Sequence, residues 1–231
     1  MSRPPLDFGL YLVTDSVQAG GWQNVAGIVE QAIAGGVTVV QVRDKHADDA
    51  TFTQLLLSVA EVARPHGVDV VVNDRVHIAA RFGFDVHIGQ DDMPLHQARE
   101  LLGPSPRIGL SVGSEAELDA VLDTTIRPDV LGLGPVFATS TKLDAGASLG
   151  ITGLQKLARR AAQNSLASVA IGGITSSNIN AVRQTTVDGV CVVSAIMSAE
   201  NPRLAALTLS AHPPQVTSHT PSSFAPSPKE E

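Results

Sequence analysis

Short runs of apolar and β-branched residues recur along the chain and are separated by segments with helical spacing. Such runs, when they are bounded by turn residues, are typical of strands buried on both faces of a parallel sheet. Eight of them occur, at residues 10–14, 37–42, 68–72, 86–88, 108–111, 130–134, 168–173 and 189–194. We therefore expect eight strands.

The segments between these runs carry the signals of helices. Residues 22–36 have apolar positions three and four apart and end on a glycine pair, a common helix stop. A second such segment, residues 48–67, should stop at Pro65. Ser114, followed three residues later by Glu117, predicts a capping box at the start of a further helix.

Alternation of eight strands with a similar number of helices predicts a (β/α)₈ TIM barrel, an α/β fold. A doubly wound open sheet is the alternative, but it rarely reaches eight such equal units. We expect residues 1–211 to form this barrel as a single catalytic domain. Residues 212–231 are rich in proline and serine and have little to bury, which predicts a disordered C-terminal tail.

Composition narrows the classes of function. The formal net charge of −7 argues against a nucleic-acid partner, although a local pocket can still bind small anions. The single cysteine, Cys191, excludes a disulfide within the chain. No apolar stretch is long enough to span a membrane, and the first residues lack a secretory pattern, so we expect a cytoplasmic protein with no membrane partner. The oligomeric state is left open, a homo-oligomer included.

Polar residues or glycines follow every predicted strand. In a TIM barrel, this end of the strands carries the chemistry. In chain order these features are Asp15; Gln41, Arg43 and Lys45; Asn73, Asp74 and Arg75; Asp91 and Asp92; Ser111; Lys142; Gly172 and Gly173; and Ser194.

The stretch after the second run, "QVRDK", places a charge inside the barrel mouth. Side chains alternate along a strand, so Gln41 and Arg43 share one face and Val42 lies on the other. A buried arginine there needs an anion. That anion is either a ligand phosphate or a carboxylate on a neighbouring strand, Asp15 or Asp74.

Asp74 and Asp92 follow adjacent strands, so their carboxylates can converge. Two carboxylates in one pocket repel unless a cation or a proton intervenes. Mg²⁺ suits such a pair because it combines one or two carboxylates with water and substrate phosphates. The alternatives are a helix cap by Asp92 and an ion pair of Asp74 with Arg75. With Arg43 and Lys45 at the same mouth, the pattern predicts a magnesium diphosphate site.

A second anion site is predicted at the ends of the seventh and eighth strands. Loops after the seventh and eighth strands of such barrels commonly bind phosphate through backbone N–H groups. Gly172 and Gly173 allow a close approach of the backbone, although a simple tight turn is an alternative. Two separate anions indicate a reaction that joins two phosphorylated small molecules.

The chain resembles thiamine-phosphate synthases along nearly the whole predicted barrel. The motifs that carry the resemblance are "LYLVTD", "VQVRDK", "NDRV", "HIGQDD", "IGLS", "GPVFATSTK", "AIGGI" and "VVSAIM". The resemblance implies a transferase that couples a hydroxymethylpyrimidine diphosphate to a thiazole phosphate, or to its carboxylated form with loss of CO₂. It also implies that Mg²⁺ is the cofactor and that pyrophosphate leaves before the thiazole nitrogen attacks.

The resemblance also implies roles for individual residues. The pyrimidine diphosphate would be bound by Gln41, Val42, Arg43, Asp44, Lys45, Asn73, Ser111 and Lys142, of which Arg43, Lys45, Ser111 and Lys142 are the catalytic set. The thiazole phosphate would be bound by Thr139, Ser140, Thr141, Gly173, Val193 and Ser194. The magnesium ligands would be Asp74 and Asp92.

The sequence departs from the family pattern at two places. The segment before Val86 is one residue shorter, which leaves Asp91 as the alternative metal ligand to Asp92. Gly113 stands where related barrels often have a histidine, which the sister thiazole tautomerases use. A tautomerase-like isomerase and a non-catalytic phosphometabolite-binding barrel are therefore the alternative functions. We expect His87 to be a hydrogen-bonded core histidine outside the site.

Overall fold

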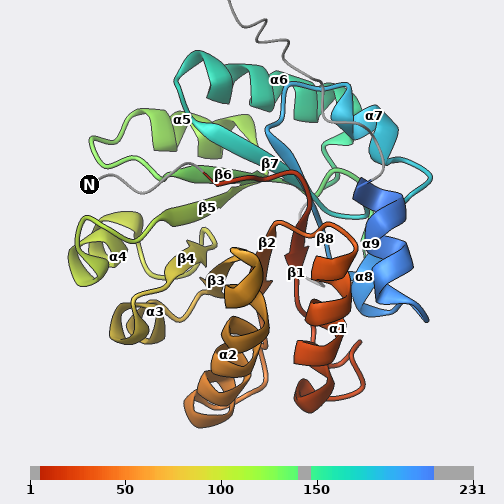
Figure 1. Cartoon of the computed structure of the whole chain (residues 1–231). Coiled ribbons are helices and arrows are strands. Elements are labelled where there is room, and N and C mark those ends of the chain that lie inside the picture. The colour runs from red at the N-terminus through yellow and green to blue at the C-terminus, as the bar shows by residue number, and fades with distance from the viewer. Residues whose placement is uncertain (1–5, 140–146, 211–231) are drawn as a thin grey trace, which may run out of the picture.

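Eight parallel strands close into a barrel with helices around it (Figure 1). The computed structural model describes residues 6–139 and 147–210. The strands are β1 (Tyr11–Val13), β2 (Val39–Val42), β3 (Asp69–Asn73), β4 (Asp85–Ile88), β5 (Ile108–Val112), β6 (Val130–Leu133), β7 (Ala167–Ile171) and β8 (Gly189–Val192). Each pairs in parallel with the next, and β8 pairs with β1. The predicted TIM barrel is confirmed.

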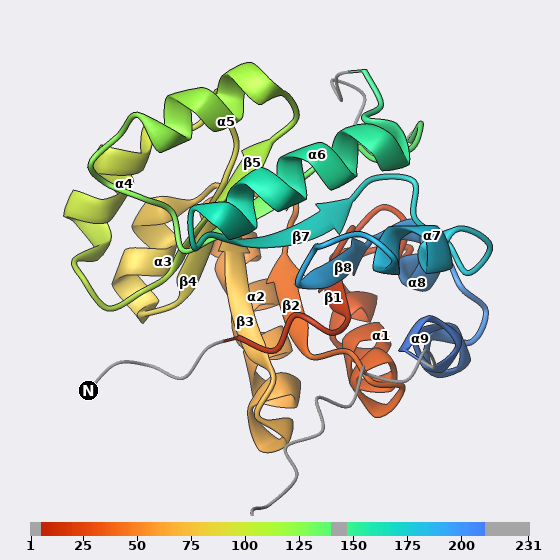
Figure 2. The same cartoon turned by 90° about the horizontal axis from the view of Figure 1, so that it is seen from above.

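The helices lie outside the strands in both views (Figures 1 and 2). They are α1 (Trp22–Ala34), α2 (Asp49–Ala63), the short 3₁₀ turn η1 (Arg64–His66), α3 (Val76–Phe82), α4 (Leu95–Leu102), α5 (Glu115–Leu122), α6 (Gly150–Gln163), α7 (Ile179–Arg183), α8 (Ser194–Met197) and α9 (Pro202–Ser210). Two helices, α8 and α9, follow β8, and α9 packs beside α1 (Figure 2). Ser194, expected at the end of the last strand, is the first residue of α8.

The two faces of the strands belong to different apolar layers. Val40 and Val42 of β2 pack outward into the large core between barrel and helices. A separate cluster fills the barrel interior and consists of Tyr11, Val13, Val39, Val71, Val130, Val169 and Cys191. Because side chains alternate, every second residue of a strand points to the interior, and this sets which polar residues reach the mouth.

The predicted helix boundaries are largely confirmed. Helix α1 ends at Gly35, and α2 gives way to η1, which contains Pro65. Ser114 caps α5 as expected, because its side chain accepts a hydrogen bond from the Glu117 amide at 3.2 Å. The second half of the capping box is wrong: the Glu117 carboxylate accepts from the Gly113 amide, at 2.7 Å, instead of from Ser114. Glu117 therefore supports the loop that leaves β5.

Among the described helices, none is long and apolar enough to cross a lipid bilayer. The predicted tail, residues 212–231, lies outside the described residues, so the division at residue 211 stays a prediction.

Candidate active site

A cavity of about 410 Å³ opens where the strands end, and all eight strands contribute to its wall. Of the predicted site residues, the structure brings together around this cavity Gln41, Arg43, Lys45, Asn73, Asp74, Asp92, Ser111, Thr139, Gly173, Val193 and Ser194. Three more, Ser140, Thr141 and Lys142, lie outside the described residues, and their roles stay predictions.

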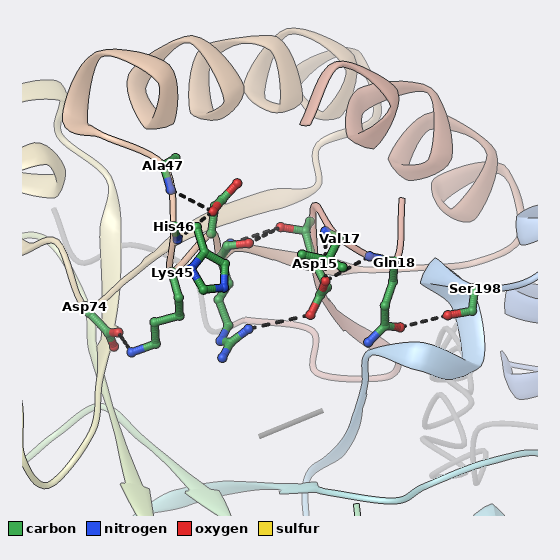
Figure 3. Close-up of polar contacts among 11 residues, drawn as sticks. Asp15, Val17, Gln18, Lys45, His46, Ala47, Asp74 and Ser198 are labelled. Atoms are coloured by element: carbon green, nitrogen blue, oxygen red, sulfur yellow. Dashed lines mark hydrogen bonds and ion pairs between the residues drawn. The ribbon is translucent and has the colours of Figure 1, made fainter. Parts of the chain in front are cut away.

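Arg43 is held at the mouth by the neighbouring end of β1. Its backbone amide donates to the Thr14 hydroxyl at 2.9 Å, and its guanidinium lies 3.7 Å from the Asp15 carboxylate. Asp15 in turn accepts the amides of Val17 and Gln18, each at 3.0 Å (Figure 3). The ion pair with Asp15, one of the two alternatives for Arg43, is thus present. At 3.7 Å it is loose, so the guanidinium can still bind an anion in the cavity.

Lys45 and Asp74 form an ion pair between the ends of β2 and β3, with the Lys45 ammonium directed at the carboxylate (Figure 3). The Asn73 side chain donates to the other carboxylate oxygen of Asp74 at 2.8 Å. Asp74 itself has a left-handed backbone, with φ of 59°. Such a conformation costs energy for a residue other than glycine and is often found at functional sites.

Asp92 interacts with Asp74 across the same wall. Burial raises the pKa of Asp74, and the Asp92 carboxylate raises it further, against the opposing effect of Lys45. One Asp92 oxygen accepts the Gly89 amide at 2.7 Å. Two carboxylates that repel each other in a half-buried wall form a set of hard oxygen donors that suits a divalent cation.

Neither structural alternative for these aspartates is found. Asp92 does not cap the following helix, because Pro94 occupies the N-cap position of α4. Arg75 does not pair with Asp74; its guanidinium instead contacts Asp49 at 2.5 Å. Within residues 6–139 and 147–210, no cluster of three or more histidine, cysteine or acidic side chains could bind a metal ion. A metal here would rely on the Asp74 and Asp92 pair and on ligands from water and substrate.

The opposite wall is built from the loops after β6, β7 and β8. The loop after β6 runs along the end of β7, because the Val136 amide donates to Ile171 at 2.9 Å and the Phe137 amide donates to Gly172 at 3.0 Å. Gly173 has φ of 64°, and a Cβ there would lie 2.7 Å from the Ala138 oxygen. Glycine is therefore required where the two loops touch.

Two predicted binding residues do not reach the cavity with their side chains. Val42 is buried in the outer core, on the face of β2 opposite to Gln41 and Arg43. The Asp44 carboxylate is used locally, where it accepts the amides of His46 and Ala47 at 2.9 Å each. Any contact of these two residues with a ligand in the cavity would have to involve the backbone.

The cavity wall also contains residues that the sequence interpretation did not assign to the site, among them Tyr11, His87 and Glu117. The Tyr11 hydroxyl accepts a hydrogen bond from the Gln41 side chain at 2.9 Å, and burial raises its pKa, which keeps it neutral. His87, assigned to the core, lies with Nε2 3.0 Å from the Ser111 hydroxyl. Alternation along β4 was a signal for His87, since Asp85, His87 and Gly89 share a face.

Comparison with known proteins gives a consistent result. Residues 10–196 match the family model described as thiamine monophosphate synthase. The chain is 45% identical over 198 residues to a thiamine-phosphate synthase of Laribacter hongkongensis, with 85% of this chain and 91% of the relative covered. It is 41% identical over 202 residues to a thiamine-phosphate synthase of Desulfitobacterium hafniense, covering 87% and 95%.

A solved structure and a longer relative extend the comparison. The thiamine phosphate pyrophosphorylase from Pyrococcus furiosus superposes with a TM-score of 0.77 at 32% identity, covering 88% of this chain and 94% of that one. The thiamine biosynthesis multifunctional protein ThiED of Corynebacterium efficiens is 48% identical over 208 residues, which cover 88% of this chain. The chain spans only 28% of the length of that multifunctional relative.

Proposed function

The chain belongs to the thiamine monophosphate synthase family, and from this membership we propose that it couples hydroxymethylpyrimidine diphosphate to thiazole phosphate, giving thiamine phosphate and pyrophosphate. The family makes it a transferase of thiamine biosynthesis. One observation carries the proposal: a single cavity has cations and paired carboxylates on one wall and a glycine-rich double loop on the other. This arrangement suits two phosphorylated substrates held face to face.

We propose that the wall formed by β2, β3 and β4 binds the diphosphate. Arg43 and Lys45 supply positive charge, and Asp74 with Asp92 would bind Mg²⁺. Burial and the neighbouring Asp92 carboxylate both raise the pKa of Asp74, which supports this assignment because a divalent cation would relieve both effects. When bound, Mg²⁺ would neutralise charge that develops on the departing diphosphate.

The opposite wall is proposed to bind the thiazole phosphate. Thr139, Gly173, Val193 and Ser194 line this wall, and we propose that the Thr139 hydroxyl and backbone amides at the ends of β7 and β8 bind the phosphate. A phosphate bound there would place the thiazole ring against the pyrimidine. Holding two reactants in this way supplies part of the rate enhancement by positioning alone.

The proposed reaction is a dissociative substitution. The bond between the pyrimidine and the diphosphate breaks first, its electron pair leaves with the diphosphate, and the amino group of the ring stabilises the resulting cation. The thiazole nitrogen then forms the new bond with its lone pair; the carboxylated thiazole also loses CO₂. Preorganised charges on Arg43 and Lys45 stabilise the leaving group, and no nucleophilic side chain is needed.

The alternatives predict a different outcome in the same assay. A tautomerase-like isomerase or a non-catalytic phosphometabolite-binding barrel would bind the thiazole phosphate but release no pyrophosphate. Gly113, which lines the cavity where the sister group has its histidine, argues for the synthase. Pyrophosphate release by the purified protein with both substrates, with and without Mg²⁺, tests the proposal.

We place this reaction, which consumes small phosphorylated metabolites, in the cytoplasm.

A further inference from the structure

We propose that His87 is a positioning residue that holds the Ser111 hydroxyl in the orientation needed to donate a hydrogen bond to the diphosphate. The inference rests on the proposed function and deepens it, because it assigns a role in the same site to a residue that the sequence interpretation placed outside that site. It starts from one contact: His87 Nε2 lies 3.0 Å from Ser111 Oγ, and both residues line the cavity.

The strand register directs the imidazole toward Ser111. His87 of β4 is paired with Gly109 of β5, and Ser111 follows two residues later on the same face. Ser111 is in turn paired with Gly132 of β6. The ring of His87 therefore crosses above Gly109 to reach the serine, and the three strands together fix one polar contact inside the barrel mouth.

Two glycines form the slot that holds the ring. A Cβ on Gly109 would lie 2.4 Å from His87 Nδ1, and a Cβ on Gly132 would lie 2.9 Å from His87 Cε1. Real Cβ atoms do not approach that closely, so any side chain at either position would move the imidazole. The close packing restricts the movement of the ring, whose Nε2 faces Ser111 Oγ at 3.0 Å.

The backbone of Ser111 is held by Gln90, a residue of the loop that follows β4. The Gln90 side chain donates to the Ser111 backbone carbonyl at 2.6 Å. Backbone and hydroxyl of Ser111 are thus each held from β4 or from the loop that follows it. A residue that only filled space would not need two separate polar restraints.

The chemistry assigns a direction to the contact. A diphosphate has acceptor oxygens only, so a serine that binds it must donate its hydroxyl proton. The Ser111 oxygen can then accept from His87 Nε2–H, which requires the tautomer that carries the proton on Nε2. A Ser111 hydroxyl that accepts from His87 cannot donate its proton to the same nitrogen. The proton is therefore available to the diphosphate before the diphosphate binds.

The test is a double-mutant cycle on the rate of pyrophosphate release with Mg²⁺ and both substrates. His87→Leu fills the slot without a donor, and His87→Gln restores an N–H near the position of Nε2. We expect His87→Leu to lower kcat about tenfold, the factor corresponding to one net hydrogen bond. His87→Gln should recover most of that loss. Ser111→Ala should lose at least as much, and adding His87→Leu to it should cause no further loss.

A second variant and a matched control keep the test decisive. Gly109→Ala leaves His87 in place but displaces its ring, and should reproduce the loss in the wild-type background and not in Ser111→Ala. His96→Leu removes an exposed histidine on α4 and should leave the rate unchanged. Thermal unfolding of each variant shows whether it is folded.

The outcomes separate this inference from the function on which it rests. Additive losses in the cycle, or equal rates for His87→Leu and wild type, would overturn the role of His87 while leaving the synthase activity intact. A wild-type protein that releases no pyrophosphate would instead overturn the proposed function.

Discussion

Lys45 and Asp74 pair across the ends of neighbouring strands, so the lysine proposed to bind the diphosphate contacts a carboxylate proposed to bind the metal. The Lys45 side chain is 47% exposed, whereas that of Asp74 is 18% exposed. The lysine can therefore swing out to solvent more easily than the aspartate can move. The lysine lowers the pKa of Asp74 and so partly offsets the effect of the neighbouring Asp92 carboxylate.

Lys45→Met should separate metal binding from catalysis. Without the ammonium, Mg²⁺ no longer competes with a cation at Asp74, so the ligand-free variant should bind Mg²⁺ several-fold more tightly by isothermal titration calorimetry. The rate of pyrophosphate release should fall by about 10²–10³, because the positive charge of Lys45 that stabilises the leaving diphosphate is lost. Lys156→Met, which removes an exposed ion pair with Glu115, is the control. Weaker Mg²⁺ binding by Lys45→Met would refute this competition.

Asp74→Asn should make the metal-free protein more stable at neutral pH. Burial raises the pKa of Asp74, so the folded chain binds a proton that the unfolded chain has already released, and stability is lost as pH rises through that interval. Asparagine removes this cost and tolerates a positive φ. Urea unfolding should show the gain at pH 7 and its disappearance below about pH 4, the ordinary carboxyl pKa. A less stable variant at pH 7 would contradict the assignment.

The choice between Asp91 and Asp92 can be settled by paired substitutions. Asp92 interacts with Asp74, whereas Asp91 is exposed at the rim of the cavity. Asp92→Asn should lower pyrophosphate release by about 10²–10³ and raise the Mg²⁺ concentration needed for half-maximal rate. It should still fold, because an amide oxygen can accept the Gly89 hydrogen bond. The interpretation fails if Asp91→Asn has the larger effect in the same Mg²⁺ titration.

Gly173→Ala and Gly67→Ala form a matched pair for the thiazole wall. Both glycines have nearly the same left-handed backbone, with φ of 64° and 66°. A Cβ on Gly67 would meet nothing within 4 Å, whereas on Gly173 it would meet the loop that carries Thr139. Gly67→Ala should lose about 1–2 kcal/mol of unfolding free energy from backbone strain, and Gly173→Ala should lose more, because its Cβ also clashes with the Ala138 oxygen. Only Gly173→Ala should raise the KM for thiazole phosphate, measured by initial rates; equal KM values would exclude Gly173 from that site.

The sequence predicted the fold because its signals are local and repeat along the chain. Apolar runs alternate with helical segments, and the alternation within β2 correctly placed Gln41 and Arg43 toward the barrel interior. Placing the polar residues at the strand ends was enough to find most of the polar residues of the cavity wall, since closure of the barrel brings those ends together.

The side-chain contacts between neighbouring strands could not be predicted from the sequence. Whether Arg43 pairs with Asp15 or Asp74, and whether Asp74 pairs with Arg75 or Lys45, depends on side-chain reach across the barrel and not on sequence spacing. His87 was assigned to the core because a single histidine in an apolar run usually belongs there. Its role depends on Gly109 and Gly132, whose missing side chains make room for the ring only after three strands are in register.

The most direct test of the account is pyrophosphate release by the purified full chain. The protein would be given pyrimidine diphosphate with thiazole phosphate, in parallel reactions that omit each substrate or Mg²⁺. We predict release that requires both substrates and the metal, with one thiamine phosphate formed for each pyrophosphate. Absence of release in the complete reaction, while the protein still binds thiazole phosphate, would contradict the assignment and favour an isomerase or a non-catalytic barrel.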